Sequence, residues 1–576
     1  MFAAPLCALL AGVPFAQSGA QASTVLPPPG QRGSCDGAMV TAVEIRVHPP
    51  SYNGMGAKAY ETMGVVGLRH VTTRANVVLA YLHVQVGVPC TERDRLESER
   101  LLRAQPFLST AAVRTVPDGD GRVRVLVDVV DEIPIVLGAS SSRGTLASLA
   151  LGSQNISGLG LGVVLDWSKG FAYRDGFGVR AIQSGEFGGP QYVALTAEQK
   201  PLGESLMLEV ARPFLTDLQR HAFHLGSGES SDYYGLVRPA GGNVARYVRR
   251  TYYDAGYVQR IGSRDPSRIL ALVGAVVLGE DVRVGDSTKV VSDSGLFNRP
   301  DSAFLTRYPA FAVTRVALIA GVRSLSFSTV SGFDALRAEQ DVGIGVQLDV
   351  LAGPSIWASR GARDVFFAGD LYAGVGGAES FFSARLLAEA HRNQDTRDWE
   401  GAVGSARFAW YGKPSDRRTR LVSLEVSGIQ HLAFPTQLTF RDADGGLPGF
   451  QDATAAGGLR GVVRIEERKL ISLFPTRIDF AIAGFVDAGK IWAGDVPFGT
   501  TSVVRSSVGF SLLGGYPAGG KRTNRVDFAV PINPESGRAR FELRFSSYDH
   551  TRLLWIEPRD VAGARTGAVP ANLMKW

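Results

Sequence analysis

The fold is decided between residues 459 and 489, by the segments LRGVVRIEERKL (residues 459–470) and RIDFAIAGFVDAG (residues 477–489). Alternate side chains of a β-strand point to opposite faces. One face of the second segment reads Arg477, Asp479, Ala481, Ala483, Phe485, Asp487 and Gly489, and the other reads Ile478, Phe480, Ile482, Gly484, Val486 and Ala488. An apolar face suits lipid and a charged face suits a water-filled interior, so the pattern predicts strands of a transmembrane β-barrel.

The same alternation returns near the end of the chain, at residues 525–532 and 538–545. A soluble β-sandwich also alternates and is the structural alternative for these segments taken alone. Residues 134–550, however, contain only strand-like segments, many followed by Gly, Asp, Ser or Pro clusters. At roughly 26 residues per strand and loop, this region predicts an all-β transmembrane barrel of about 16 antiparallel strands.

The N-terminus has the pattern of a secretory signal. An apolar run from Phe2 to Ala16 precedes Ala20-Gln21-Ala22, which fits a small-x-small cleavage site. We therefore expect a signal peptide over residues 1–22, followed by a linker over residues 23–39. No other window approaches the roughly 20 continuous apolar residues that a membrane helix needs.

A small mixed domain is predicted over residues 40–133, and a tail over residues 551–576. The expected elements of the mixed domain are a strand at 40–47, helices at 73–82 and 91–104, and strands at 111–116 and 122–130. Thr91 is the expected N-cap of the second helix, with Asp94 three residues on. Cys35 and Cys90 remain after signal removal, and export makes a disulfide between them one of two open readings, free thiols being the other.

The composition argues against several functions. The 61 basic and 55 acidic residues are scattered, with no basic block interleaved with aromatics, so nucleic-acid binding is disfavoured. No serine elbow, HExxH motif or phosphate-binding loop occurs, and the cysteines lack a CxxC or His cluster. His221 and His224 lie three apart and are expected to be structural. We therefore expect no enzyme activity, no cofactor and no metal.

Several motifs together resemble the BamA/TamA superfamily, or bacterial surface antigen family, of outer-membrane barrels. The mixed domain, with its β-α-α-β-β order, resembles a single polypeptide-transport-associated (POTRA) domain. The motifs similar to those of the family are Gln154–Gly160, Leu459-Arg460-Gly461-Val462, Glu466-x-Arg468, Phe485-x-Asp487-x-Gly489 and Arg525–Pro531. Two departures are Val462 in place of an aromatic residue and a chain that continues past the last strand.

The resemblance implies a loop six that folds back into the lumen, with Arg460 bonded to Glu466 and Asp487. The residues of this expected lock are Arg460, Gly461, Glu466, Arg468, Phe485, Asp487 and Gly489. The resemblance also implies capture of clients by strand addition at the POTRA-like domain, for which Val123, Val125 and Val127 are the expected edge residues.

The expected location is the bacterial outer membrane, with the N-terminal domain in the periplasm. The expected function is assembly of outer-membrane proteins or translocation of polypeptides, without enzyme activity. The expected partners are outer-membrane lipid, lipopolysaccharide, unfolded outer-membrane or secreted polypeptides, and periplasmic accessory proteins. A passive channel or structural surface antigen, and a secretion pore for one dedicated exoprotein, are the alternatives.

Overall fold

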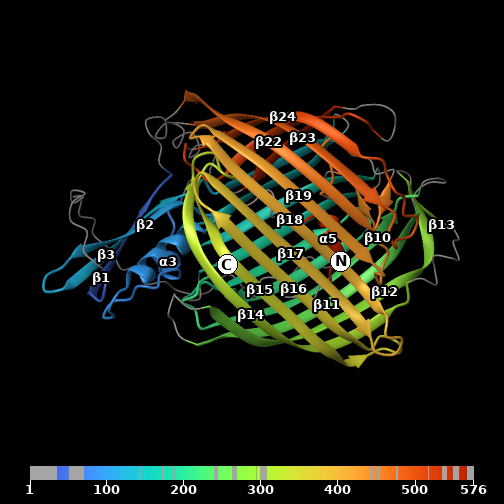
Figure 1. The fold of residues 1–576 in the computed structure, drawn as a ribbon, viewed down its shortest axis with the longest axis horizontal. Helices are drawn as coiled ribbons and strands as arrows, with labels where there is room; N and C mark the ends of the chain where they lie inside the picture. The colour runs from blue at the N-terminus through green and yellow to red at the C-terminus, as the bar shows by residue number, and fades with distance from the viewer. Residues whose placement is uncertain are drawn as a thin grey trace.

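A computed structural model of the chain describes residues 35–50 and 71–566, except residues 143–144, 172–173, 186–188, 239–243, 263–268, 293–294, 299–307, 442–444, 451–454, 475–477, 517, 535–540 and 549–556. The predicted signal peptide lies outside the described residues. The described chain forms a large β-barrel with a small N-terminal domain beside one of its openings (Figure 1). We call this opening the proximal end of the barrel and the opposite opening the distal end.

The N-terminal domain consists of one sheet and two helices. Its elements are β1 (Met39–His48), α2 (Ala75–Leu79), α3 (Glu92–Arg103), β2 (Leu108–Pro117) and β3 (Arg122–Asp131). The Thr91 side chain accepts a hydrogen bond from the Asp94 backbone N–H at 3.1 Å, so the predicted N-cap of α3 is confirmed. Cys35 and Cys90 form a disulfide that ties the start of β1 to the segment before α3.

The order of strands in this sheet is β1-β3-β2, with β1 parallel and β2 antiparallel to β3. The prediction that Val123, Val125 and Val127 form a free edge is therefore wrong. They belong to β3, which is paired on both sides, and all three are at most 2% exposed. The valine-rich sequence of β3 suits a central strand, because a neighbouring strand covers each of its edges.

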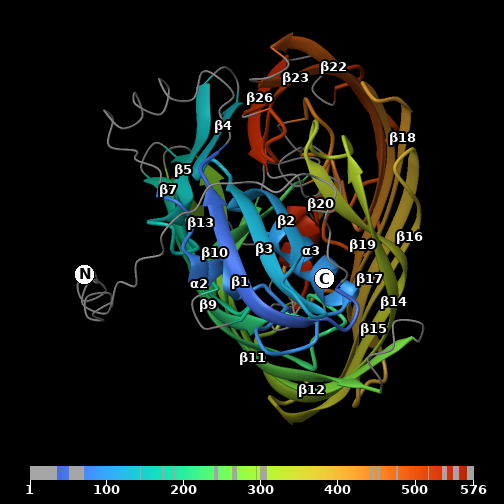
Figure 2. The same ribbon diagram turned by 90° about the vertical axis from the view of Figure 1, so that its left-hand side faces the viewer.

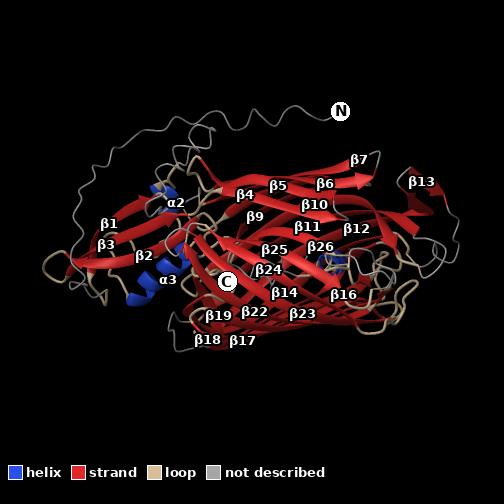
Figure 3. Cartoon of the chain, turned by 90° about the horizontal axis from the view of Figure 1, so that it is seen from above, coloured by secondary structure: helices blue, strands red, loops and turns tan. Residues whose placement is uncertain are grey.

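The barrel is closed and antiparallel. Its strands are β4 (Ile135–Ser142), β5 (Thr145–Ile156), β6 (Leu161–Phe171), β7 (Arg174–Ser184), β8 (Tyr192–Gln199), β9 (Glu204–Arg212), β10 (His221–Leu236), β11 (Val244–Ile261), β12 (Leu270–Ser292), β14 (Phe311–Ser331), β15 (Glu339–Ala358), β16 (Asp364–Gly376), β17 (Ser380–Asn393), β18 (Trp399–Ser415), β19 (Arg418–Gln430), β22 (Leu459–Phe474), β23 (Ile478–Trp492), β24 (Arg505–Gly515), β25 (Thr523–Pro531) and β26 (Glu542–Tyr548). Each pairs with the next, and β26 pairs with β4. Figure 2 shows the barrel from the side of the N-terminal domain, and Figure 3 shows it from above. Three short strands lie outside this ring of 20. They are β13 (Gly295–Asn298), which pairs antiparallel with the end of β12, and β20 (Leu438–Thr439) and β21 (Ala456–Gly457), which pair with each other.

The ring thus has 20 strands in the described residues, and the prediction of about 16 is wrong. Strand-like segments are recognisable in the sequence for 15 of the 20 strands, which an even count rounds to about 16, but not for β4, β7, β10, β11 and β17. Their outward faces are short or interrupted: β10, for example, contains Gly-Ser-Gly-Glu-Ser-Ser-Asp at its centre. A strand whose lumenal residues are polar and whose outer residues are small has little hydrophobic signal.

Burial confirms the predicted alternation of the decisive segments. Along β22 and β23 the charged residues that face the lumen include Arg460, Glu466 and Asp487, which are buried, whereas Val463, Ile465 and Val486 face outward and are 39–53% exposed. Glu467, Lys469 and Lys490 are charged residues on the outward face. In the described residues, no helix has both the length and the apolar character that crossing a membrane requires.

The turn between β5 and β6 fastens the N-terminal domain to the barrel. Gly158 has φ +70°, and a Cβ on it would lie 2.1 Å from the Thr72 carbonyl oxygen. The Arg74 backbone N–H donates to the Gly158 carbonyl at 2.9 Å, and the Asn155 side chain donates to the Thr73 hydroxyl at 2.7 Å. The Asn-x-x-Gly-x-Gly motif is therefore a docking turn, because only glycine permits this close approach.

Candidate functional site

The site is built on the lumenal face of β22 and its neighbours. Arg460 is fully buried near the distal end of β22. Its Nη1 donates to Asp560 Oδ2 at 2.6 Å and to the Thr439 carbonyl at 2.7 Å, and its Nη2 donates to Glu425 Oε1 at 3.1 Å. Arg460 therefore joins three segments: the barrel wall, the loop between β19 and β22, and the C-terminal segment.

The prediction that Arg460 bonds to Glu466 and Asp487 is wrong. Asp487 lies opposite Arg464 in the ladder and accepts from it at 3.0 and 3.1 Å. Glu466 is six residues along β22 from Arg460, which corresponds to about 20 Å. An arginine side chain cannot span that distance, so residues of matching charge on one strand face pair locally instead.

Glu466 forms a second cluster nearer the proximal end. Its carboxylate pairs with Arg468 and, at 2.8 Å, with Arg525 of β25. The Arg525 guanidinium lies 5.8 Å from the centre of the Phe485 ring, a cation–π arrangement. The structure thus brings Glu466, Arg468 and Phe485 of the predicted site together, but around Arg525 rather than Arg460.

Gly489, one of the two predicted glycines, lies against the loop between β19 and β22. A Cβ on Gly489 would lie 2.9 Å from the Gly461 carbonyl oxygen and 3.0 Å from the Phe440 ring. Phe440 belongs to the β19–β22 loop and packs with Leu447, Phe450, Val462 and Ile491. Gly489 therefore leaves room for the loop against the inner wall. The β19–β22 loop is the loop that was expected to be loop six. Counted from β4 it is the eighth distal loop, because strands that the sequence did not reveal precede it.

The proximal turn between β14 and β15 also enters the lumen. Its Phe333 carbonyl accepts from Arg468 Nη1 at 2.6 Å, and Asp334 accepts from the Tyr411 hydroxyl at 2.6 Å. The Phe333 ring stacks on Tyr411 with centroids 4.8 Å apart, and Arg337 pairs with Asp479 at 3.0 Å. A turn held by β18, β22 and β23 fills part of the proximal lumen.

The C-terminal segment occupies the lumen further in. Residues 557–566 contain the short helix α5 (Arg559–Ala564), which lies inside the barrel wall (Figures 1 and 2). Val561 and Ala564 are buried against Val403, Ile429 and Leu438.

Ionic contacts reach this segment from widely separated strands. Arg250 of β11 donates to the Gly563 carbonyl at 3.0 Å and to the Arg565 carbonyl at 2.8 Å. Glu389 of β17 accepts from Arg565 at 3.1 Å and from the Thr566 backbone N–H at 2.5 Å. With Arg460 of β22, these contacts make the segment a lumenal plug. We use that name for residues 557–566.

Sequence reasoning treated the plug as part of a tail. A signal was present, because Glu557-Pro558-Arg559-Asp560 places a proline and an acidic residue at the start of a helix, which is a common start pattern. The helix α5 has only six residues, which is too short for hydrophobic periodicity to reveal it.

The two histidines face opposite sides of β10, as their spacing predicted. His221 stacks on Tyr257 with ring centroids 6.1 Å apart. His224 is buried in the lumen and lies between Asp254 and Glu209, the latter at 3.1 Å. No group of three or more metal-ligating side chains with suitable geometry occurs in the described residues.

The N-terminal domain contacts the proximal rim at several points. Arg103 of α3 pairs with Asp341 of β15 at 2.8 Å, and Arg100 donates to the Leu215 carbonyl at 2.6 Å. Lys521, in the turn between β24 and β25, donates its backbone N–H to Glu132 at 3.0 Å. Helix α3 therefore lies beside the mouth of the barrel.

Outward-facing aromatic residues mark the depth of the apolar wall. Trp399 and Trp410 of β18 are 48% and 37% exposed, and Trp399 lies beside Arg392 with 5.3 Å between guanidinium carbon and ring centre. Their separation corresponds to about 36 Å along the strand, or roughly 26–30 Å along the barrel axis at the usual strand tilt. An apolar band of this height between aromatic belts, on a closed barrel, is the architecture of outer-membrane proteins. The chain is an outer-membrane β-barrel.

Comparison with known proteins gives structural neighbours but no family. No protein-family model matches the chain, and no curated protein matches it. BamA from Haemophilus ducreyi lacking POTRA domains 1–3 has 11% identity and a TM-score of 0.38, covering 89% of this chain and 85% of that one. CdiB from Acinetobacter baumannii has 11% identity, a TM-score of 0.41 and coverages of 89% and 74%. CdiB from Escherichia coli has 10% identity, a TM-score of 0.42 and coverages of 89% and 77%. Both identity and TM-score are too low for these structures to carry an argument about family or function.

Proposed function

We propose that the chain inserts polypeptides into the outer membrane or moves them across it, and that the seam between β4 and β26 is where a client strand engages the barrel. The observation that carries this proposal is the weakness of the seam. Within the described residues, β26 and β4 share one pair in register, Arg544 opposite Ser140. By contrast, β25 and β26 are in register from Thr523 to Ala529.

A seam with so few paired residues is the least costly place to open the barrel. Backbone groups in lipid must be hydrogen-bonded, so opening any full ladder would expose many unsatisfied groups. Opening β4 from β26 exposes few that were paired, and the freed edges can pair with an incoming strand.

The N-terminal domain, which we propose is POTRA-like, supplies a second strand edge. The β2 edge is covered at Val113, whose N–H donates to Glu99 of α3 at 2.9 Å and whose carbonyl accepts from Arg95. The start of β1 is covered by residues 87–90: the Val40 N–H donates to the Val88 carbonyl at 3.2 Å, and the Val40 carbonyl accepts from the Gly87 N–H at 2.9 Å. From Ala42 to His48, β1 is an edge strand of the described sheet, and we propose this stretch as the place of client capture.

A pair of cysteines tests the seam directly. In Ser140→Cys with Arg544→Cys, a disulfide formed in the folded barrel would hold β4 to β26. The control, Ser140→Cys with Ser148→Cys, shares one position but links β4 to β5, where the two serine hydroxyls lie 2.6 Å apart. Clients should accumulate on the proximal side of the membrane in the seam-locked variant alone, and adding a reductant should release them.

The readout is quantitative proteomics of the outer membrane and the medium after oxidation. Loss of one secreted polypeptide would identify a dedicated secretion pore, and loss of several barrels would identify an assembly role. Unchanged levels of every barrel and secreted protein in the seam-locked variant would reject the proposal and leave a passive channel or a structural antigen.

A further inference from the structure

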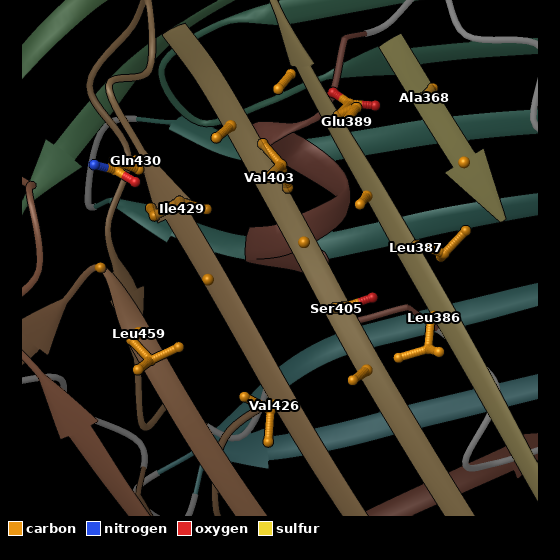
Figure 4. A pocket seen from close by; sticks show the side chains of 18 of the residues that line it. Ala368, Leu386, Leu387, Glu389, Val403, Ser405, Val426, Ile429, Gln430 and Leu459 are labelled. Atoms are coloured by element: carbon orange, nitrogen blue, oxygen red, sulfur yellow. The ribbon is translucent and has the colours of Figure 1, made fainter. Parts of the chain in front are cut away.

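A groove of about 930 Å³ is hollowed into the barrel wall across β16, β17, β18, β19 and β22 (Figure 4). Its position on the strands places it in the distal half of the apolar band. The residues that line it and face outward by strand alternation are Phe367, Gly369, Leu386, Ala388, Ala390, Ala402, Gly404, Ala406, Val426, Gly428, Gln430 and Leu459.

The groove opens toward lipid rather than toward the lumen. Phe367, Leu386 and Leu459 in its lining are 37–39% exposed. Val403 and Ile429 also line the groove, and their side chains point to the lumenal side of the same strands, where they pack against Val561 and Ala564 of the lumenal plug. No residue of the plug lines the groove, so the hollow lies on the outer surface of this wall.

Small residues create the hollow. The floor is glycine and alanine on adjacent strands, and the space above is open: a Cβ on Gly404 would meet only the Leu387 carbonyl oxygen, at 3.6 Å. Phe367 packs near Trp399 on one side, with ring centroids 5.7 Å apart. A Cβ on Gly428 would come within 3.4 Å of Leu459, which stands at the other side. An outer wall built in this way accepts acyl chains more deeply than a wall of large side chains.

Two cations border the groove at its distal end. Arg392 on β17 lies over Trp399, and Lys490 on β23 lies over Trp492 with 5.4 Å between Nζ and the ring centre. β17 and β23 are four inter-strand spacings apart, which is about 19 Å. Both side chains face outward at belt depth, where long basic side chains reach lipid phosphates. Asp495, at the distal edge, is paired with His431 at 3.1 Å.

We infer that the groove binds a multiply acylated glycolipid carrying two phosphates, the chemistry of lipid A in the distal leaflet. The groove extends over five strands, so it holds more than one acyl chain side by side. Its two cations lie on opposite sides, so one lipid must carry two separate anionic groups to meet both. The leaflet assignment rests on the proposed function, which puts the N-terminal domain in the periplasm.

The test is native mass spectrometry of the full-length protein, released from detergent after incubation with bisphosphorylated lipid A, monophosphorylated lipid A or phosphatidylglycerol. We expect the wild type to retain bisphosphorylated lipid A most strongly. Gly404→Leu with Gly428→Leu fills the groove and should lower retention about tenfold, equivalent to ~1.4 kcal/mol. The matched control is Gly484→Leu, because Gly484 also faces lipid and a Cβ there would meet nothing within 4 Å.

A second variant probes the cations without changing the shape of the wall. Arg392→Gln with Lys490→Gln should remove the preference for two phosphates over one while some lipid A remains bound. Equal retention in the groove-filled variant and the Gly484→Leu control would overturn the inference. Equal retention of phosphatidylglycerol and lipid A by the wild type would overturn it as well. Neither result bears on the seam, so the proposed function and this inference fail independently.

Discussion

Asp560 and Arg460 form a bonded pair in the lumen: Arg460 Nη1 donates to Asp560 Oδ2 at 2.6 Å and its Nη2 to Oδ1 at 3.2 Å. Two parallel contacts between a guanidinium and a carboxylate are strong and directional. The pair joins the wall of the barrel to the lumenal plug. The sequence predicted that Arg460 bonds within the β22–β23 hairpin. Its partner Asp560 instead belongs to a segment a hundred residues further along the chain.

Removing the carboxylate should loosen the plug. Asp560→Asn leaves the Arg460 charge buried with fewer partners, and breaking a buried ion pair in this way costs about 3–5 kcal/mol. We expect more frequent and larger openings in planar bilayer recordings than for the wild type. Arg464→Gln is the control, because Arg464 and Asp487 form a lumenal ion pair between β22 and β23 of the wall. Identical conductance traces for Asp560→Asn and wild type would contradict the role given to the pair.

Gly158→Ala should detach the N-terminal domain from the barrel. The substitution combines a positive φ, which costs about 1–2 kcal/mol, with a Cβ 2.1 Å from the Thr72 carbonyl oxygen. Gly121→Ala has nearly the same φ, +73°, but nothing within 4 Å, so it isolates the cost of the clash. Hydrogen exchange of residues 72–81 should rise in Gly158→Ala only. Equal exchange in the two variants would show that the turn does not hold the domain.

Loss of the disulfide should destabilise the N-terminal domain and leave the barrel folded. Cys35 and Cys90 are 55 residues apart, and a cross-link closing a loop of that length contributes about 4 kcal/mol in the chain-entropy view. In Cys90→Ser, limited proteolysis should cleave the domain at lower protease concentration. The heat-modifiable migration of the barrel on gels should stay the same. If the protease pattern of the wild-type protein were the same with and without reductant, the disulfide would not be stabilising.

The contact at Glu132 should depend on pH. Burial raises the pKa of Glu132 above its ordinary value, although the Lys521 N–H and the Arg522 charge act in the opposite direction. Between the ordinary and the raised pKa the folded state binds more protons than the unfolded state, so stability is greatest below this window and falls as pH rises through it.

Glu132→Gln should remove that dependence, since an amide does not titrate. The measurement is the protease resistance of the domain–barrel junction as a function of pH, between about pH 4 and pH 7. A wild-type junction whose resistance increases with pH across this interval would have the wrong sign for a carboxyl with a raised pKa.

Much of the architecture could be predicted because it follows from alternation. The in-and-out pattern of β22 and β23, the order of the N-terminal elements and the N-cap at Thr91 all depend on local sequence. The strand count could not be predicted, since strands such as β10 carry polar residues, here Ser227, Glu229 and Ser231, where a lipid-facing row was sought. The partners of Arg460 could not be predicted either. Pairing across a lumen depends on register between distant strands and on a plug only six helical residues long.

The position of α5 has a consequence for how the chain reaches its native state. Arg250, Glu389 and Arg460 come from β11, β17 and β22, and all three must point inward at the right height to hold one short helix. A slip of one residue in any of those strands would turn its charged side chain toward lipid. Only a barrel with all three strands in the correct register therefore presents these contacts to the helix together.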